Sequence, residues 1–178
     1  MTPEELKLLI RTVPDFPRKG IKFRDITTLL ASGEGLTASV EHIAKRANAV
    51  GAGAIAGLEA RGFIFGAAVA SLLMLGFVPV RKAGKLPVPT IGVDYALEYG
   101  ESRLEIDPTL IAEGERIIIV DDLLATGGTA LAAAKLLREA GAVVDRALFV
   151  IDLPDLGGSK LLRENGIEVE ALMEFEGD

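Results

Sequence analysis

Two adjacent carboxylates, Asp121 and Asp122, stand where a buried strand is expected to end. Residues 117–120 read Ile-Ile-Ile-Val, an unbroken aliphatic run typical of a parallel strand covered on both faces. After the carboxylates comes a Thr-Gly-Gly-Thr turn at residues 126–129, and then an Ala- and Leu-rich stretch that favours helix. A helix N-terminus preceded by glycines can hold an anion with its backbone N–H groups. The pattern predicts a site for a ligand with a phosphate on one side and a vicinal diol or metal ion on the other, a description that ribose 5-phosphate fits.

The overall charge of the chain shows that such an anion needs local compensation. Twenty-six acidic against nineteen basic residues leave a net charge of −7, which argues against non-specific binding of nucleic acid. An anionic substrate must therefore meet basic side chains that are clustered. The candidates are Arg18, Lys19, Lys22, Arg24, Arg61, Arg81, Lys82 and Lys85.

The elements that position these residues form two strand–helix–strand units, and right-handed crossovers are expected for both. A length of 178 residues suggests one domain. We therefore predict an α/β fold with a central, mainly parallel sheet flanked by helices. The predicted strands are 54–58, 77–80, 116–120, 142–151 and 167–175, and the predicted helices are 36–50, 63–75, 130–140 and 156–165.

Two segments depart from this alternation. In the first, about residues 1–35, a capping-box start at Thr2 predicts a helix to about Thr12, followed by a Pro- and Gly-rich stretch, a short strand at 21–24 and a helical turn. In the second, residues 81–114, alternating pieces at 90–97 and 102–106 predict a hairpin. Long excursions from a compact domain are usually functional, so we interpret this segment as a flap over the site.

Composition excludes several classes of protein. The chain has no cysteine, which rules out disulfides, zinc–thiolate sites and thiol catalysis. No apolar run approaches the roughly 18 residues that a membrane span needs. The first residues are acidic and lack the features of a signal peptide, so we expect a cytoplasmic protein that binds no membrane.

Residues 121–129, Asp-Asp-Leu-Leu-Ala-Thr-Gly-Gly-Thr, resemble the phosphoribosyl diphosphate (PRPP) signature of type I phosphoribosyltransferases, most closely that of the adenine phosphoribosyltransferase branch. The resemblance extends over nearly the whole chain. It implies the type I phosphoribosyltransferase fold, with residues 1–35 as an N-terminal hood and residues 81–114 as the flap. The implied reaction converts adenine and PRPP to AMP and pyrophosphate in purine salvage. The resemblance also implies a homodimer, and Mg²⁺ carried by PRPP without a protein cage.

The same resemblance assigns catalytic roles. Asp121 and Asp122 would face the ribose hydroxyls and the positive charge that develops at C1. Glu98 matches the flap glutamate that meets adenine N7, where a carboxyl can donate or accept a proton. Tyr99 would lie near the reacting ribose.

Substrate-binding roles are implied in four places. The turn at residues 126–129 would hold the 5-phosphate, and residues 59–62 would grip pyrophosphate through Arg61 and backbone N–H groups. Ala60 stands where the family often has serine, which leaves only a backbone contact there. The basic segment at 81–85 would neutralise pyrophosphate, and backbone groups around residues 22–24 would recognise adenine, with Phe23 stacking on the base. The implied substrate contacts are Lys22, Phe23, Arg24, Ala60, Arg61, Arg81, Lys82, Lys85, Tyr99, Leu123, Ala125, Thr126, Gly127, Gly128 and Thr129.

Two alternatives stay open on the residues. One is a phosphoribosyltransferase for a 6-oxo purine such as hypoxanthine, guanine or xanthine, which would present an acceptor where adenine presents a 6-amino donor. The wording around residues 23–25 and 95–100 favours adenine. The other is a PRPP-sensing regulator of the same fold that binds nucleic acid. The acidic charge, the lack of an added DNA-binding segment and the flap glutamate disfavour it.

Overall fold

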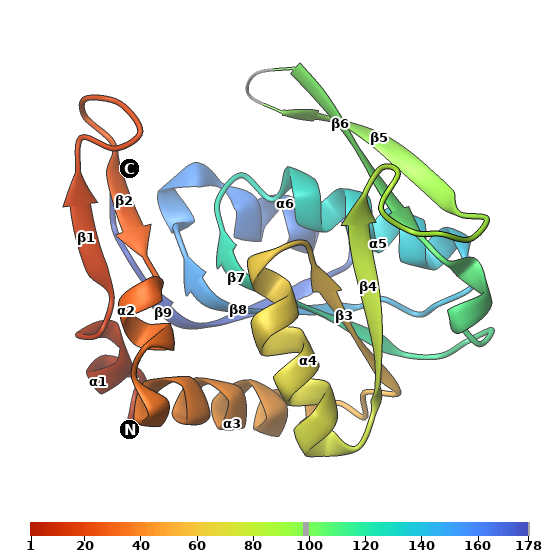
Figure 1. Ribbon diagram of the computed structural model, residues 1–178, viewed down its shortest axis with the longest axis horizontal. Helices are drawn as coiled ribbons and strands as arrows, with labels where there is room; N and C mark the ends of the chain where they lie inside the picture. Colours follow the sequence, from red (N-terminus) through yellow and green to blue (C-terminus); the bar gives the residue numbers. More distant parts are fainter. Residues whose placement is uncertain (98–99, 178) are drawn as a thin grey trace.

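The computed structural model describes residues 1–97 and 100–177, and its centre is a seven-stranded sheet in the order β5-β6-β4-β3-β7-β8-β9 (Figure 1). The strands β3, β4, β7, β8 and β9 run parallel, whereas β6 is antiparallel to both β4 and β5. The prediction of a mainly parallel sheet is thereby confirmed, with the flap hairpin added at one edge. The strands are β3 (Ala54–Leu58), β4 (Gly76–Lys82), β5 (Ile91–Leu97), β6 (Gly100–Ile106), β7 (Ile117–Leu124), β8 (Arg146–Asp152) and β9 (Glu168–Glu174).

Helices cover both faces of the sheet, which explains the unbroken aliphatic strands. Alternate residues of β7 point to opposite sides: Ile117 and Ile119 pack in the core beneath α5 and α6, and Ile118 and Val120 in the core beneath α3 and α4. All four of these side chains are fully buried. The covering helices are α3 (Gly33–Ala49), α4 (Arg61–Leu73), α5 (Gly128–Glu139) and α6 (Gly158–Glu164), and short 3₁₀ turns η1 (Pro108–Leu110) and η2 (Pro154–Leu156) precede β7 and α6.

The N-terminal hood forms a separate layer at the β9 end of the sheet (Figure 1). It contains α1 (Pro3–Lys7), a two-stranded antiparallel sheet of β1 (Arg11–Pro14) and β2 (Lys22–Asp25), and α2 (Thr27–Leu30). The expected capping box at Thr2 is present. The predicted extension of the first helix to about Thr12 is wrong, because β1 pairs with β2 and takes residues 11–14 into a strand. Ladder hydrogen bonds with a distant segment outweighed the local preference for helix.

Further boundaries differ from prediction, among them the strand predicted from residue 142, which begins as β8 at Arg146. The last helix begins at Gly158 instead of residue 156, because Pro154–Leu156 forms a separate 3₁₀ turn. Strand β4 continues through Lys82, where it pairs with β6, so Arg81 and Lys82 belong to the sheet and do not follow it. Among the helices of the described residues, none is long and apolar enough to cross a membrane.

Candidate active site

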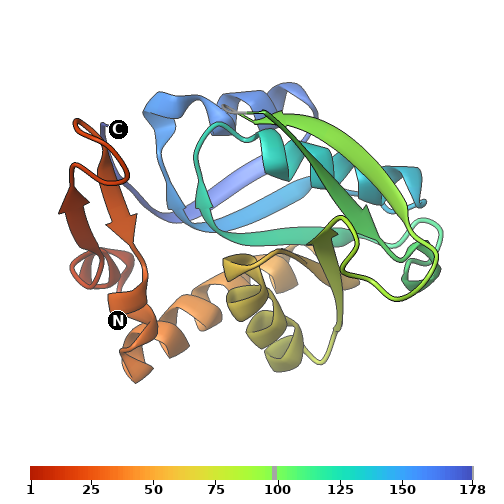
Figure 2. The same ribbon diagram turned by 45° about the horizontal axis from the view of Figure 1, so that its top comes forward.

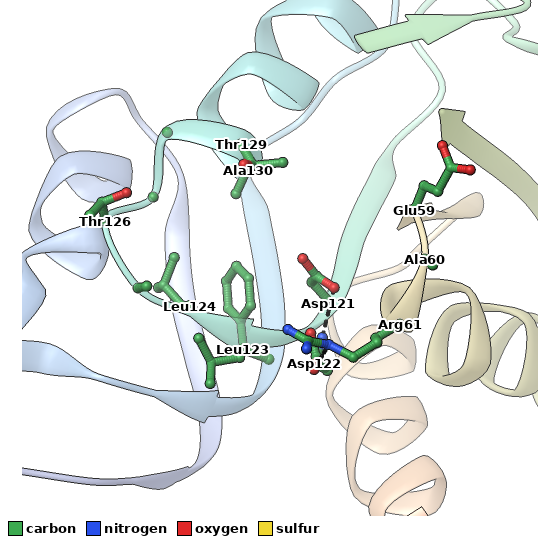
Figure 3. Close-up of a pocket in the computed structure, with 14 residues that line it drawn as sticks. Glu59, Ala60, Arg61, Asp121, Asp122, Leu123, Leu124, Thr126, Thr129 and Ala130 are labelled. Atoms are coloured by element: carbon green, nitrogen blue, oxygen red, sulfur yellow. Dashed lines mark hydrogen bonds and ion pairs between the residues drawn. The ribbon is translucent and has the colours of Figure 1, made fainter. Parts of the chain in front are cut away.

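A cavity of about 400 Å³ opens at the carboxyl ends of β3 and β7 (Figure 3). These strands are neighbours in register, with Gly57 opposite Val120, so the residues that follow each strand meet at one edge. Ligands of open α/β sheets bind at this edge. Of the predicted site residues, the cavity is lined by Ala60, Arg61, Asp121, Asp122, Leu123, Ala125, Thr126, Gly127, Gly128 and Thr129, and the lining also includes Glu59, Leu124, Ala130 and Phe149.

The two carboxylates differ in their surroundings. Asp122 is 4% exposed, and its Oδ2 forms an ion pair with Arg61 Nε at 2.6 Å. Asp121 is only partly buried, and its Oδ1 accepts a hydrogen bond from the Asp122 backbone N–H at 2.9 Å. Figure 3 shows Arg61 reaching from the start of α4 to the aspartates on β7. Sequence position alone gave no sign of this contact.

Gly62 explains how the α4 N-terminus comes so near to β7. A Cβ at this position would lie 2.7 Å from Asp121 Oδ1 and 2.9 Å from the Val120 carbonyl oxygen. Any side chain would therefore push the helix away from the strand, and glycine permits the approach. The Arg61 guanidinium reaches Asp122 because of this close contact.

The pKa values of both aspartates are raised. Burial raises the pKa of Asp121 well above its ordinary value, and the neighbouring charge of Asp122 raises it further. Burial also raises the pKa of Asp122, although the Arg61 guanidinium acts in the opposite direction. The two carboxyl groups thus take up a proton more readily than exposed aspartates would, and positive charge from a ligand would be stabilised there.

The turn before α5 offers backbone groups to an anion. Gly127 has a φ of 85°, a left-handed conformation that glycine adopts without strain, and α5 begins at Gly128 with no side-chain cap from a described residue. The first N–H groups of α5 therefore remain available to a ligand in the cavity. Thr126 and Thr129 add hydroxyl groups at the same turn.

Gly158, the first residue of α6, supports this turn from behind, and the sequence prediction did not include it. Its backbone N–H donates to the Ala125 carbonyl oxygen at 3.0 Å. A Cβ on Gly158 would lie 2.4 Å from that oxygen and 3.0 Å from Gly127 N. The Gly-Gly pair at residues 157–158 is the signal that could have indicated a close approach of two backbones.

Glu59 is a second functional candidate that the sequence prediction missed. Its Oε1 accepts from Arg81 Nη2 at 2.9 Å, and its Oε2 accepts from the Lys82 backbone N–H at 2.6 Å. Burial tends to raise the pKa of Glu59, but the hydrogen bonds from Lys82 and Arg81 outweigh it and lower the pKa. Glu59 is therefore ionised and ties β4 to the edge of the cavity. The side chains of Arg81, Lys82 and Lys85 themselves do not line the cavity.

The predicted base-binding residues lie apart from the cavity lining. Lys22, Phe23 and Arg24 belong to β2 in the hood, and the Phe23 ring meets Phe16 edge-on, with centroids 5.2 Å apart. The flap hairpin extends across α5 in both views (Figures 1 and 2). The predicted site residues Glu98 and Tyr99 lie outside the described residues. Within residues 1–97 and 100–177, no group of three or more His, Cys, Asp and Glu side chains could hold a metal ion.

Comparison with known proteins identifies the class that this fold and site define. A family model described as the phosphoribosyl transferase domain matches residues 28–160. The chain belongs to the phosphoribosyltransferase family.

Relatives that match nearly the whole chain indicate one branch of this family. An adenine phosphoribosyltransferase of Novosphingobium aromaticivorans is 70% identical over 99% of both chains. The crystal structure of adenine phosphoribosyltransferase from Thermoanaerobacter pseudethanolicus superposes with a TM-score of 0.91 at 48% identity, covering 98% of this chain and 100% of that one. The Saccharomyces cerevisiae enzyme, crystallised with an imino-altritol bisphosphate and adenine, has a TM-score of 0.89 at 38% identity, covering 96% and 98%. Within the phosphoribosyltransferases, the chain belongs to the adenine phosphoribosyltransferase family.

Proposed function

We propose that this chain transfers the 5-phosphoribosyl group of PRPP to N9 of adenine, giving AMP and pyrophosphate in purine salvage. The observation that carries the proposal is the cavity itself, in which Asp121 and Asp122 adjoin the uncapped N-terminus of α5. The N-terminus of α5 suits a phosphate, and the two carboxylates suit the diol of a ribose. The adenine bound to the yeast relative supports the choice of base.

In the proposed step the C1–N9 bond forms while the C1–O bond to pyrophosphate breaks, and the bonding electron pair leaves with pyrophosphate. The turn at residues 126–129 holds the 5-phosphate and so fixes the ribose. Asp121 and Asp122 face the ribose and stabilise the positive charge that grows at C1. Since their pKa values are raised by burial, an approaching positive charge would favour the ionised form that burial disfavours.

The leaving pyrophosphate requires positive charge on the opposite side of C1. Arg61 pairs with Asp122, but its side chain is half exposed, so it can turn toward pyrophosphate while the Ala60 N–H contributes a second contact. The basic segment Arg81, Lys82 and Lys85 would complete the neutralisation. Glu59 binds the Arg81 side chain and the Lys82 backbone N–H, and so holds these two residues beside the cavity.

Adenine would lie between the hood and the flap. Backbone groups of Lys22 and Arg24 would recognise its edge, and the Phe23 ring would stack on its face. The carboxylate of Glu98 would accept the proton that adenine loses from N7 as N9 attacks C1, and Tyr99 would cover the ribose. Exclusion of water by the two covers would protect the developing charge from hydrolysis.

Mg²⁺ fits this site as a companion of PRPP. Of the three carboxylates that line the cavity, Glu59 is bound to Arg81 and Lys82, which leaves Asp121 and Asp122. These are fewer donors than a protein cage needs, so oxygens of PRPP would supply most of the coordination. When bound, the ion would neutralise part of the pyrophosphate charge.

A homodimer and a cytoplasmic location complete the proposal. Three exposed apolar side chains on and just after α4, Ile64, Leu72 and Met74, are the surface that a second copy would cover. Light scattering of the purified chain tests this, and a monomer at assay concentration would refute it. The cytoplasm is the compartment proposed because PRPP and AMP are polyanions that do not cross a bilayer unaided.

Pyrophosphate release tests the reaction. The chain is incubated with PRPP, Mg²⁺ and, in separate reactions, adenine, hypoxanthine, guanine or xanthine. Release with adenine alone is the expected result. Release with a 6-oxo purine would reassign the base while leaving the phosphate site unchanged, and tight PRPP binding without release for any base would favour a sensor.

A further inference from the structure

The C-terminal end of the chain lies against the hood in both views (Figures 1 and 2). Phe175, directly after β9, is 9% exposed, and its backbone N–H donates to the Asp152 carbonyl oxygen at 3.1 Å. Two cations meet its ring: Lys7 Nζ lies 4.7 Å from the centroid and the guanidinium carbon of Arg24 lies 4.5 Å from it. Cations over an aromatic ring are attracted by its quadrupole, more strongly where water is excluded. One ring therefore joins α1 and β2 of the hood to the edge of the main sheet.

The side chain of Arg24 is engaged by this junction. Its Nη1 donates to Thr12 Oγ1 at 2.6 Å, and its Nη2 donates to the Glu176 carbonyl oxygen at 3.3 Å. The guanidinium thus binds the neighbouring strand β1 and the C-terminal tail, residues 175–177, and does not enter the cavity. One edge of β2 pairs with β1, and the backbone groups of β2 outside that pairing can bind a ligand. The Arg24 side chain fixes where that backbone stands.

The C-terminal tail also contacts the segment behind the phosphate-binding turn. The Gly177 N–H donates to Asp155 Oδ2 at 2.7 Å. Asp155 belongs to η2, which leads directly into Gly158, and Gly158 N–H binds the Ala125 carbonyl oxygen beside the turn. The C-terminal tail therefore contacts the hood on one side and, on the other side, the η2 segment that leads to Gly158 behind the phosphate-binding turn.

We propose that Phe175 is a positioning residue for the purine base. Through Lys7 and Arg24 it holds β2 at a set distance from the phosphate-binding turn, so that a base bound by the backbone of residues 22–24 presents N9 to C1 of a ribose fixed by its 5-phosphate. The role rests on the proposed function. A displacement of reacting groups by about 1 Å is enough to cost on the order of 10²-fold in rate, so the distance between the two sites matters to the reaction.

Kinetics of the full chain with Phe175→Leu test the proposal. Leucine keeps an apolar side chain in the core but offers no ring face to Lys7 and Arg24. We expect KM for adenine to rise roughly 5- to 30-fold, since two cation–π contacts are lost, while KM for PRPP stays within about twofold. Hydrogen exchange of the β1 and β2 amides should become faster, because the hood loses its attachment. Phe175→Tyr keeps the ring and should restore both properties.

Ile43→Val is the matched control, because it removes a buried carbon from the same core on α3 without altering the ring or its cations. Wild-type KM values for both substrates are expected. An unchanged KM for adenine in Phe175→Leu, or equal rises for adenine and PRPP, would overturn the positioning role. Absence of pyrophosphate release by the parent chain with adenine would instead overturn the proposed function, and the base-positioning role with it.

Discussion

Replacing Gly158 by alanine should weaken PRPP binding selectively. The new methyl group would stand 2.4 Å from the Ala125 carbonyl oxygen and 2.9 Å from Leu124 Cδ1, about 1 Å inside ordinary van der Waals contact with the former. The nearest obstacle is backbone, which cannot rotate away, so the Ala125–Gly127 segment must shift toward the cavity. Overpacking of this kind costs roughly 1–3 kcal/mol of stability.

The loss in binding follows from the groups that move. A hydrogen bond from a backbone N–H to a charged phosphate contributes about 1.5–3 kcal/mol, so misplacing one at the turn should raise KM for PRPP by roughly 10- to 150-fold. KM for adenine should change little, because the hood does not contact Gly158 directly. Steady-state kinetics with each substrate varied in turn, together with a thermal melt, measure both effects.

Gly33→Ala provides the matched control. Gly33 begins α3, has no atom within 4 Å of the added methyl group, and should keep wild-type kinetics. A folded Gly158→Ala variant whose KM for PRPP stays within about twofold of the parent would show that the turn does not depend on support from α6, and the reasoning about a rigid phosphate site would be wrong.

Three further outcomes are expected. Glu98→Gln should lower kcat more than PRPP affinity, and equal losses in kinetics and in direct PRPP binding would make Glu98 a binding or folding residue. Asp121→Asn should lower kcat and raise the Tm of the chain, measured without substrates at neutral pH. Folding raises the pKa of Asp121, so its contribution to stability is present below the ordinary aspartate value of 3.8 and is lost as pH rises through the folded pKa. The gain in Tm from asparagine should therefore vanish in acid, and an unchanged Tm at neutral pH would contradict this reasoning. Asp25→Asn should lower stability at neutral pH. Hydrogen bonds from Thr27, and to a smaller extent from Arg11, lower the pKa of Asp25 to about 2. The stability that Asp25 contributes is therefore present above pH 3.8 and is lost as pH falls toward 2. Urea unfolding should show a difference in stability between variant and parent at neutral pH that disappears near pH 2.

The phosphate-binding region was predictable from the sequence because its signals are local. An aliphatic strand, two acids, a Gly-bearing turn and a helix former follow one another within residues 116–140, and the structure has β7 and α5 in that order. Strand β3 and helix α4 were predictable for the same reason. Each pattern reports burial or backbone geometry within a few residues, and nothing distant has to be known.

The first helix shows what local sequence patterns cannot predict. Its capping box correctly marks the start at Thr2, but the helix ends at Lys7, and β1 takes residues 11 and 12, which were expected to be helical. The partner that decides this is β2, whose residues pair with residues of β1 that lie 8 to 14 positions earlier in the chain, and no local periodicity reports this pairing.

The sequence by itself determined the class of fold, the acid pair and the glycine turn, since residue types and their spacing limit what nearby backbone can do. Only the tertiary structure decided that Arg61 pairs with Asp122, that Glu59 anchors Arg81, and that Gly158 lies behind the turn. It also decided that the Arg24 side chain faces Phe175. These contacts join segments that packing brings together, and their geometry depends on strand order, helix approach and the space left by missing side chains.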